Sequence, residues 1–343
     1  MSRRSRTVHL LGPERVELRE VEVPSPGEGE IVVRIRAATT CGTDVKVFRR
    51  GGHPRMIRPP APFGHELAGT VEEAGKGARW REGDRVVVAN SASCGECPYC
   101  RESRENLCTS LEYLNGAFAE RILVPRRFAE RSTHRMPDGL GFELAALAEP
   151  LACALHGIEA CALRPRSDVA VYGAGPIGLL FAGALSSAGH RVTVADPNPS
   201  RLDAARRLGA AEAVQIERGG GHTATSHAAD PKGFDAAIDA TGVPEVWLDA
   251  IRSVRPGGTV NLFGGCAPGT TVPLDTALVH YSELTLKGVY HHRPADVKRA
   301  IEMLAARSFD AGILLSAEMP LERVEDALRS MMRKEALKVV IRA

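Results

Sequence analysis

The sequence of 343 residues has no strong charge of either sign, because 44 Lys and Arg residues balance 42 Asp and Glu residues and leave a net charge of +2. Proteins that bind nucleic acids or anionic membranes usually carry a clear basic excess. We therefore expect neither a nucleic-acid partner nor a membrane partner. A small molecule of little or no charge fits this balance better.

The sequence also lacks an uninterrupted apolar segment that could cross a membrane. Its longest uncharged stretch, Val169 to His190, contains five glycines and a proline, which indicates a buried globular segment. The basic start, Met1 to Arg6, leads directly to Val8 and Leu10 without the apolar region of a signal peptide. We therefore expect a cytoplasmic protein.

Cysteine is scarce, with eight residues in the whole chain, and four of these fall between Cys94 and Cys108. This clustering is typical of a metal site in a reducing compartment and argues against a disulfide framework. The hydrophobic content of 44% and charged content of 25% are those of a globular protein. At roughly 100 to 200 residues per domain, the length predicts two domains.

The first part of the chain predicts a β-rich domain. The segments VELREVEV and IVVRIRA alternate apolar and polar residues on either side of the turn Pro24 to Gly27, as antiparallel strands do. Turn residues separate three further strand signals, and little helical periodicity lies between them. These signals cover residues 67–72, 85–89 and 120–124.

After Pro150 the pattern changes to short apolar strands that alternate with Ala- and Leu-rich helical segments, which predicts a doubly wound parallel sheet. The strands are expected at residues 168–172, 191–195, 234–240 and 259–263. The Gly-rich stretch Arg218 to Asp230 is expected to be a surface loop. Helices at 294–306 and 321–332 and a strand at 337–341 are expected to close the chain.

A glycine turn predicts a dinucleotide site. The sequence Gly173-Ala-Gly175-Pro176-Ile177-Gly178 follows an apolar strand and opens an apolar helix, so a pyrophosphate could lie at the helix N-terminus. Asp196 ends the next predicted strand, where a carboxylate binds ribose hydroxyls and repels a 2′-phosphate. This favours NAD, while Arg191 and Arg201 keep NADP as an alternative. A glycine turn that only packs a helix on a sheet is the structural alternative.

The four clustered cysteines, Cys94, Cys97, Cys100 and Cys108, predict a structural metal site. Their spacing offers four thiolates in one loop, enough to close a tetrahedral zinc shell without water. An iron–sulfur cluster is the competing interpretation, since thiolates hold these as well. A nucleic-acid zinc finger is disfavoured because the cysteine pairs lie too close together and no basic helix follows.

Cys41, His65, Glu66 and Glu149 are candidate ligands for a second metal site. A thiolate, an imidazole and carboxylates suit a zinc ion that keeps one position open for water or substrate. The four residues lie far apart in sequence, so spacing alone does not join them. A buried structural cysteine and a hydrogen-bonded core histidine are the alternative interpretation.

Several motifs together resemble the zinc-dependent medium-chain alcohol dehydrogenase family. They are the stretch PFGHELAGTVEEAG from Pro62 to Gly75, the following Gly-Asp-Arg-Val from Gly83, and Cys41-Gly-Thr-Asp44. The cysteine cluster and the glycine turn follow in the family's order, so the resemblance covers essentially the whole chain. Ala148-Glu149-Pro150-Leu151 is similar to the sorbitol dehydrogenase branch, in which a glutamate replaces the third-ligand cysteine of other members.

This resemblance implies an α/β fold with two domains and an active site in the cleft between them. A GroES-like catalytic domain would comprise residues 1–150 and 286–343, and a Rossmann NAD-binding domain residues 151–285. Cys41, His65 and Glu149 would hold a catalytic zinc, with Glu66 beside it as a supporting or exchanging ligand. The four clustered cysteines would hold a structural zinc.

The resemblance also implies roles in proton transfer for the residues that follow Cys41. Thr43 matches the hydroxyl that first receives the alcohol proton, and Asp44 matches a carboxylate that orients a zinc ligand; a helix cap is the alternative role for both. Lys46 stands where many members have a histidine that completes the relay. Our hypothesis is that Lys46 or water replaces this histidine, and a solvated surface lysine is the alternative.

The implied function is NAD-dependent oxidation of a secondary alcohol, namely a polyol, sugar or cyclitol, by a homodimer or homotetramer. Oxidation of L-threonine or another amino alcohol is the alternative within the enzyme class. A dehydrogenase relic that only binds NAD is the alternative from a different class, but such a relic would be expected to have lost Cys41 or His65.

Overall fold

The computed structural model describes residues 3–217 and 233–343, so the predicted loop Arg218 to Asp230 lies outside the described residues. The chain forms two compact units. The first, here the β-rich unit, comprises Met1–Ala152, His292–Ala306 and Gly312–Ala343. The second, here the parallel-sheet unit, comprises Cys153–His291 and Arg307–Ala311.

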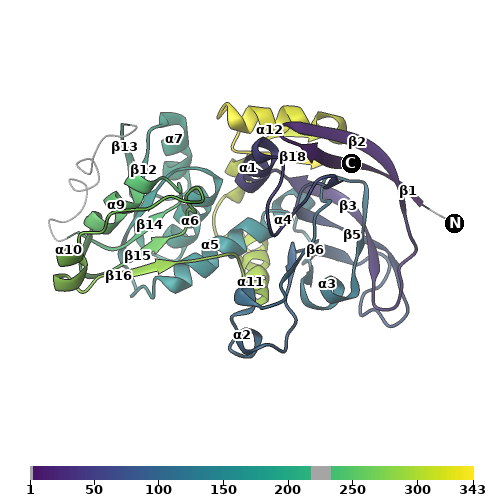
Figure 1. The fold of residues 1–343 in the computed structure, drawn as a ribbon, viewed down its shortest axis with the longest axis horizontal. Coiled ribbons are helices and arrows are strands. Elements are labelled where there is room, and N and C mark those ends of the chain that lie inside the picture. Colours follow the sequence, from purple (N-terminus) through teal and green to yellow (C-terminus); the bar gives the residue numbers. More distant parts are fainter. Residues whose placement is uncertain (1–2, 218–232) are drawn as a thin grey trace. The chain divides into compact units, whose positions relative to one another are not determined.

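Among the described residues, the strands of the β-rich unit form three sheets. Figure 1 labels several strands of the two larger sheets. The largest has the order β10-β6-β5-β3-β18-β17, with β9 also paired to β3. Its strands are β3 (Ile31–Thr39), β5 (Glu66–Ala74), β6 (Arg85–Val88), β9 (Arg121–Val124), β10 (Thr133–Arg135), β17 (Leu315–Pro320) and β18 (Lys338–Arg342). A second sheet joins β2 (Arg15–Val23), β1 (Arg3–Gly12) and β4 (Ala61–Pro62), and a third joins β7 (Ser91–Ala92) and β8 (Glu112–Tyr113).

The apolar alternation of the sequence accounts for most of these strands. In β3 the side chains of Arg34 and Arg36 are exposed between buried neighbours, so one face of the strand packs on the core. The strands on either side of the turn Pro24 to Gly27 do not pair with each other. Instead β2 pairs with β1, which the sequence did not predict, and β3 pairs with β5, β9 and β18.

Helices connect the strands of the β-rich unit, and two of those described come from its C-terminal segments. The helices are α1 (Gly42–Arg50), α2 (Pro98–Arg101), α3 (Arg126–Arg131), α4 (Phe142–Ala145), α11 (Pro294–Ala305) and α12 (Val324–Met332). The division between the units falls within α5 (Ala148–Ala160), after Ala152. Strand β18 pairs antiparallel with β3, so the end of the chain lies beside the residues that precede Cys41.

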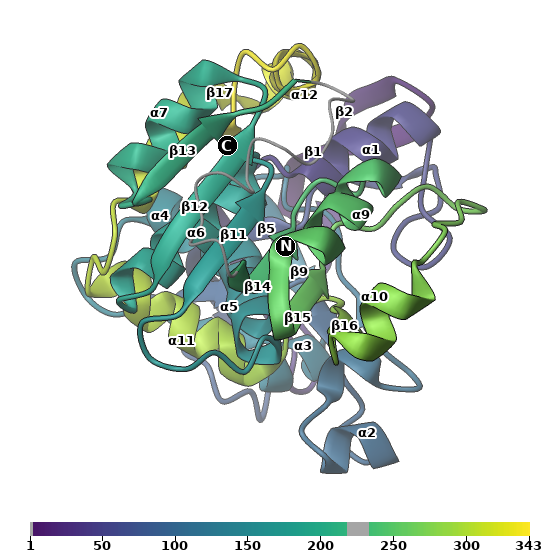
Figure 2. The same cartoon turned by 90° about the vertical axis from the view of Figure 1, so that its left-hand side faces the viewer.

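The parallel-sheet unit contains one six-stranded sheet with the order β13-β12-β11-β14-β15-β16 (Figure 2). The strands are β11 (Asp168–Tyr172), β12 (Arg191–Asp196), β13 (Glu212–Gln215), β14 (Phe234–Asp239), β15 (Val254–Leu262) and β16 (Thr285–Gly288). Described helices are α6 (Pro176–Ser187), α7 (Pro199–Arg207), α9 (Pro244–Ser253) and α10 (Thr276–Tyr281). All the pairings are parallel, which confirms the predicted doubly wound sheet.

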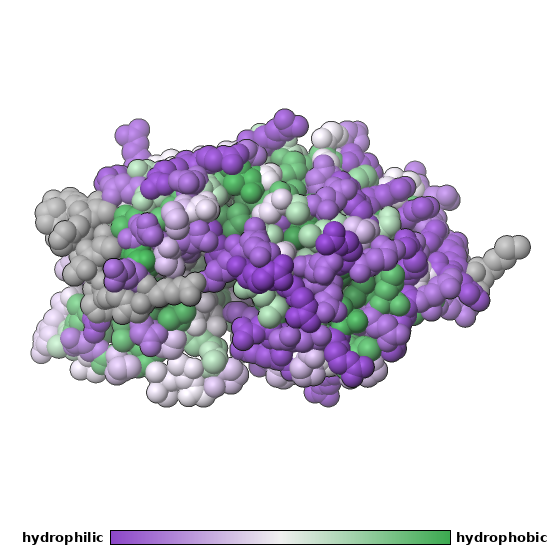
Figure 3. Space-filling view, turned by 90° about the horizontal axis from the view of Figure 1, so that it is seen from above, coloured by the Kyte–Doolittle hydropathy of each residue, from purple (hydrophilic) through white to green (hydrophobic). Residues whose placement is uncertain are grey.

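Across residues 3–217 and 233–343, no helix combines the length and the apolar character that a membrane span requires. On the face shown in Figure 3, hydrophilic residues predominate and hydrophobic residues occur in scattered groups. This pattern is normal for the outside of a folded domain.

Candidate active site and metal centres

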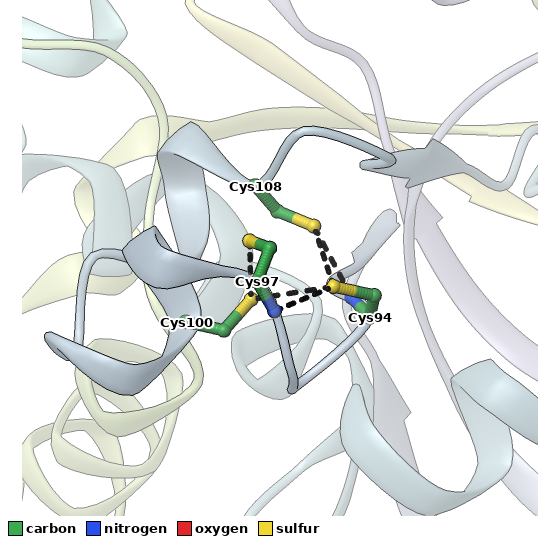
Figure 4. Close-up of side chains that lie close together, drawn as sticks. All are labelled: Cys94, Cys97, Cys100 and Cys108. Atoms are coloured by element: carbon green, nitrogen blue, oxygen red, sulfur yellow. Dashed lines mark hydrogen bonds between the residues drawn. The ribbon is translucent and has the colours of Figure 1, made fainter.

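The four predicted cysteine ligands lie together in the loop between β7 and β8. The Sγ atoms of Cys94, Cys97, Cys100 and Cys108 all lie within 4.8 Å of one another (Figure 4). The Sγ atoms of Cys97 and Cys100 are 3.5 Å apart, as are those of Cys94 and Cys108. None of the cysteines in the chain forms a disulfide. Four converging thiols with no other ligand type fit a closed tetrahedral zinc shell.

Backbone amides stabilise negative charge on this cysteine cluster. The amides of Cys97 and Gly95 donate to the Sγ atoms of Cys94 and Cys100, each over 3.3 Å. Hydrogen bonds from the backbone of Thr109 and of Cys100 lower the pKa of Cys97 to about 6, whereas burial raises that of Cys100 to about 12. The loop therefore favours the thiolate at Cys97, which is the form that binds zinc, whereas burial favours the neutral thiol at Cys100.

A second cluster joins Cys41, His65 and Glu66, whose ligand atoms all lie within 4.8 Å of one another. Cys41 is the N-cap residue of α1 and follows the end of β3 by two residues. Glu66 is the first residue of β5, and His65 directly precedes it. The pairing of β3 with β5 places Thr39 opposite Glu66, which brings the two segments together. The register of these strands therefore brings Cys41 together with His65 and Glu66, although Cys41 is too far from them in sequence for spacing to connect them.

Asp44 connects Cys41 to His65. One of its oxygens accepts a hydrogen bond from the amide of Cys41 over 2.9 Å, and the other lies 2.8 Å from Nδ1 of His65. Burial alone would lower the pKa of His65, but the Asp44 carboxylate raises it well above its ordinary value. Asp44 is therefore both a helix cap and the partner that orients His65, with Nε2 of the imidazole left for a ligand.

Lys338 is a residue of this site that sequence reasoning missed. Its Nζ lies 2.8 and 2.7 Å from the two carboxylate oxygens of Glu66, and both side chains are buried. The hydroxyl of Thr39 also donates to Glu66. The only signal was a lysine at the start of an apolar strand, and the pairing of β18 with β3 was needed to show its role.

Glu149 does not belong to the cluster of Cys41, His65 and Glu66. Its carboxylate lies 3.7 Å from Nε2 of the buried His292, which is in turn 3.2 Å from the side-chain oxygen of Asn90. Burial raises the pKa of Glu149 to about 7, and His65 opposes this shift. Glu149 is therefore close enough to the cluster for their charges to interact. Nothing in the sequence had pointed to Asn90.

The two predicted relay residues lie on α1. The amide of Thr43 donates to Sγ of Cys41 over 3.4 Å, and the side chain of Thr43 is half-buried. Lys46 is exposed, one turn further along the helix. Thr43 thus lies next to a candidate ligand, whereas Lys46 faces solvent.

The glycine turn has the geometry that its sequence predicts. Gly173 has a φ of +97°, and a Cβ on Gly178 would lie 1.8 Å from the Gly173 carbonyl oxygen, so neither position accepts a side chain. A Cβ on Gly175 would meet nothing within 4 Å, so the backbone there faces open space. Pro176 and Ile177 open α6. A pyrophosphate could approach this helix N-terminus closely.

Asp196 lies beside the glycine turn at the end of β12. One carboxylate oxygen accepts a hydrogen bond from the amide of Ala174 over 2.7 Å, and the other accepts one from the amide of Asn198 over 2.8 Å. These contacts hold a buried carboxylate next to the open backbone. Arg201 is half-buried on α7, five residues further along the chain.

A buried network around Asp239 also went unnoticed in the sequence. Asp239 ends β14 and accepts hydrogen bonds from the Thr241 amide and hydroxyl, the Gly242 amide and Nε1 of Trp247. Burial raises the pKa of its carboxyl group. Strands β11 and β14 are neighbours, and a Cβ on Gly173 would lie only 2.7 Å from the Thr241 methyl group. The network therefore supports the loop beside the glycine turn.

Comparisons with known proteins agree with this arrangement. Residues 27–138 match the alcohol dehydrogenase GroES-like domain, and residues 176–306 match the zinc-binding dehydrogenase family. Sorbitol dehydrogenase of Bacillus subtilis is 29% identical and covers 95% of this chain and 94% of its own length. L-threonine 3-dehydrogenase of Idiomarina loihiensis is 30% identical and covers 94% of both chains.

Among solved structures, a candidate zinc-binding dehydrogenase of Sinorhizobium meliloti 1021 bound to NADP has a TM-score of 0.88. It is 29% identical and covers 99% of this chain and 100% of its own. The chain belongs to the zinc-dependent medium-chain alcohol dehydrogenase family. The predicted family, oxidoreductase class and fold of a GroES-like and a Rossmann-type domain are therefore confirmed.

Proposed function

We propose that this protein is a zinc-dependent dehydrogenase that transfers a hydride from a secondary alcohol to NAD. The observation that carries the proposal is the convergence of Cys41, His65 and Glu66, with Asp44 orienting the histidine, in a zinc-binding dehydrogenase. The donor atoms fit a catalytic zinc, because sulfur, nitrogen and carboxylate oxygen are its usual ligands.

In this proposal Cys41, His65 and Glu149 hold the catalytic zinc, with Glu66 beside them, and the four clustered cysteines hold the structural zinc. A zinc ion at the first site supplies a Lewis acid that makes an alcohol hydroxyl more acidic. Asp44 keeps His65 in the orientation and tautomer that leave Nε2 available. Thr43 receives the alcohol proton, and Lys46 or water passes it to solvent.

The glycine turn binds the pyrophosphate of the dinucleotide, and Asp196 binds the adenosine ribose together with Arg201. Bound NAD would supply the hydride acceptor at this site. The buried carboxylate of Asp196 favours NAD because it would repel the 2′-phosphate of NADP. NADP remains the competing cofactor, since the S. meliloti relative binds it.

The proposed substrate is a polyol, sugar or cyclitol, and L-threonine or another amino alcohol is the second candidate. Relatives of both kinds match this chain at almost equal identity. Glu149, which resembles the sorbitol dehydrogenase branch, favours the first. A relic that only binds NAD is disfavoured because the ligand residues are present. We also propose that the enzyme is cytoplasmic and acts as a homodimer or homotetramer.

The test is the initial rate of NADH formation by zinc-loaded protein with a panel of polyols, sugars, cyclitols and L-threonine. Each substrate is offered with NAD and, separately, with NADP. We expect turnover of one stereochemical group of alcohols with NAD and no turnover by Cys41→Ser protein. Turnover of L-threonine alone would select the second candidate. If protein with bound zinc and NAD oxidises no substrate of the panel, the result would support a protein that only binds NAD.

A further inference from the structure

Lys338 is the only Lys or Arg with a buried side chain among the described residues. It is 1% exposed, although a charged amine loses much of its hydration energy when it leaves water. Such a group persists only when an opposite charge and hydrogen bonds compensate it. The compensating group is Glu66, a member of the candidate catalytic metal cluster.

Three strands hold this pair. Thr39 ends β3, Glu66 begins β5 and Lys338 begins β18. Two hydrogen bonds between Thr40 and Val339 hold β18 in place. The Val339 amide donates to the Thr40 hydroxyl over 2.8 Å, and the Thr40 amide donates to the Val339 carbonyl over 3.0 Å. The ammonium group of Lys338 is therefore held at the Glu66 carboxylate.

Both carboxylate oxygens of Glu66 already have partners. The Lys338 ammonium lies within hydrogen-bond distance of each, and the Thr39 hydroxyl donates to one. Yet Glu66 lies close enough to Cys41 and His65 for all three to bind one ion. A carboxylate engaged in this way competes poorly as a metal ligand, and a nearby positive charge repels a divalent cation.

We propose that Lys338 is a positioning residue that holds Glu66 out of the permanent ligand shell of the catalytic zinc and limits how tightly the site binds the ion. The third position is thereby left to Glu149. This inference rests on the proposed function, because it needs zinc at the site of Cys41 and His65. A purely structural role of Lys338 predicts the opposite result, because its loss would then disorder the site and weaken zinc binding.

The test measures zinc release from full-length, zinc-loaded protein to a chromogenic chelator. Cys41→Ser protein identifies the fraction of zinc that belongs to the catalytic site. Lys338→Met retains side-chain length without the charge, and we expect it to release this fraction about tenfold more slowly than the wild type, because Glu66 becomes a ligand. The matched control is Lys298→Met, at a lysine whose side chain is 75% exposed, and it should release zinc like the wild type.

Two further variants separate the ligand role from folding. Lys338→Met/Glu66→Gln removes both charges and should return the release rate to near that of the wild type. Glu66→Gln alone should also release zinc at a rate near that of the wild type. If Lys338→Met fails to fold, Lys338→Arg and Glu66→Gln provide the test. Lys338→Arg should release zinc like the wild type because it retains the positive charge. Glu66→Gln should do so because Glu66 is not a permanent ligand.

The inference is overturned if Lys338→Met releases zinc as fast as the wild type or faster, or if Glu66→Gln releases it as fast as Cys41→Ser. Wild-type protein that binds only the zinc of the cysteine cluster would overturn the proposed function and this inference together. Wild-type protein with two zinc ions and dehydrogenase activity, combined with unchanged release from Lys338→Met, would overturn the inference alone.

Discussion

Nδ1 of His65 lies 2.8 Å from a carboxylate oxygen of Asp44, and both side chains are buried. Because Asp44 also binds the amide of Cys41, one aspartate positions two proposed zinc ligands. The position of the catalytic zinc should therefore be as sensitive to Asp44 as to the ligands themselves.

We expect Asp44→Asn to weaken zinc binding at the catalytic site by about 10- to 100-fold, because an amide neither orients the imidazole as firmly nor raises its basicity. Competition with a chelator of known affinity measures the effect. Asp138→Asn, at an exposed aspartate of the same unit, is the control. Unchanged zinc affinity in Asp44→Asn would contradict the orienting role.

Replacing Cys97 by Ser should remove the structural zinc. The Sγ atoms of the four cysteines lie within 4.8 Å of one another, and loss of one thiolate opens the shell to water. Zinc content by elemental analysis should fall from two ions per chain to one, and the thermal unfolding midpoint should fall by roughly 5 °C or more. Cys266→Ser, outside the cluster, should change neither quantity. An iron signal in the wild type would favour the iron–sulfur interpretation.

Asp196→Asn should reduce the preference for NAD over NADP. The substitution keeps the size of the side chain but removes the negative charge that opposes a 2′-phosphate. We expect the ratio of kcat/KM for the two cofactors to shift towards NADP by about tenfold. Asp203→Asn, at an exposed aspartate of the same unit, is the control. A wild type that prefers NADP would refute the role of Asp196 directly.

Trp247→Phe should destabilise the parallel-sheet unit. Nε1 of Trp247 lies 3.1 Å from Asp239 and 3.0 Å from the Gly264 carbonyl oxygen, and phenylalanine leaves a buried carboxylate with one donor fewer. The expected loss is about 1–3 kcal/mol in the free energy of unfolding, measured by urea denaturation. Tyr281→Phe, at a tyrosine that is 83% exposed, should have little effect.

His134 should make the stability of the β-rich unit depend on pH. Burial, assisted by the charge of Arg79, lowers the pKa of His134 to about 4, and its Nε2 has no hydrogen-bond partner among the described residues. An unfolded histidine titrates near 6.5, so the unfolded chain binds the extra proton first. The contribution of the neutral His134 to the free energy of unfolding is therefore fully present above about pH 6.5 and is lost as the pH falls towards 4.

As the pH falls from 7.5 to 4, the wild type should lose about 3 kcal/mol in free energy of unfolding that His134→Leu does not lose. Denaturant unfolding at several pH values measures the difference. His280→Leu, at an exposed histidine, is the control. A constant difference between wild type and His134→Leu over this range would show that His134 does not titrate on unfolding.

Local patterns were sufficient to predict those features that depend on neighbours in the chain. The glycine turn at Gly173 to Gly178 and the strands on either side of it were predicted from spacing, because the glycines, the strand before them and the helix after them are consecutive in the chain. The four cysteines likewise belong to one loop. For these parts, residue type and separation determine the geometry directly.

Sequence spacing did not join Cys41 to His65, which only the family resemblance had placed at one site, and the tertiary structure shows the two side chains close together. The tertiary structure alone revealed Lys338 beside Glu66 and placed Glu149 against His292. The contacts of Cys41 with His65 and of Lys338 with Glu66 depend on which strands pair and in which register, because a shift of one residue turns a strand side chain to the other face of the sheet. The contact of Glu149 with His292 depends instead on the packing of α5 against the segment that precedes α11. The β3–β5 and β18–β3 pairings connect segments up to some 300 residues apart. Residue type alone therefore determined which chemistry was available, and strand register decided which of these residues meet.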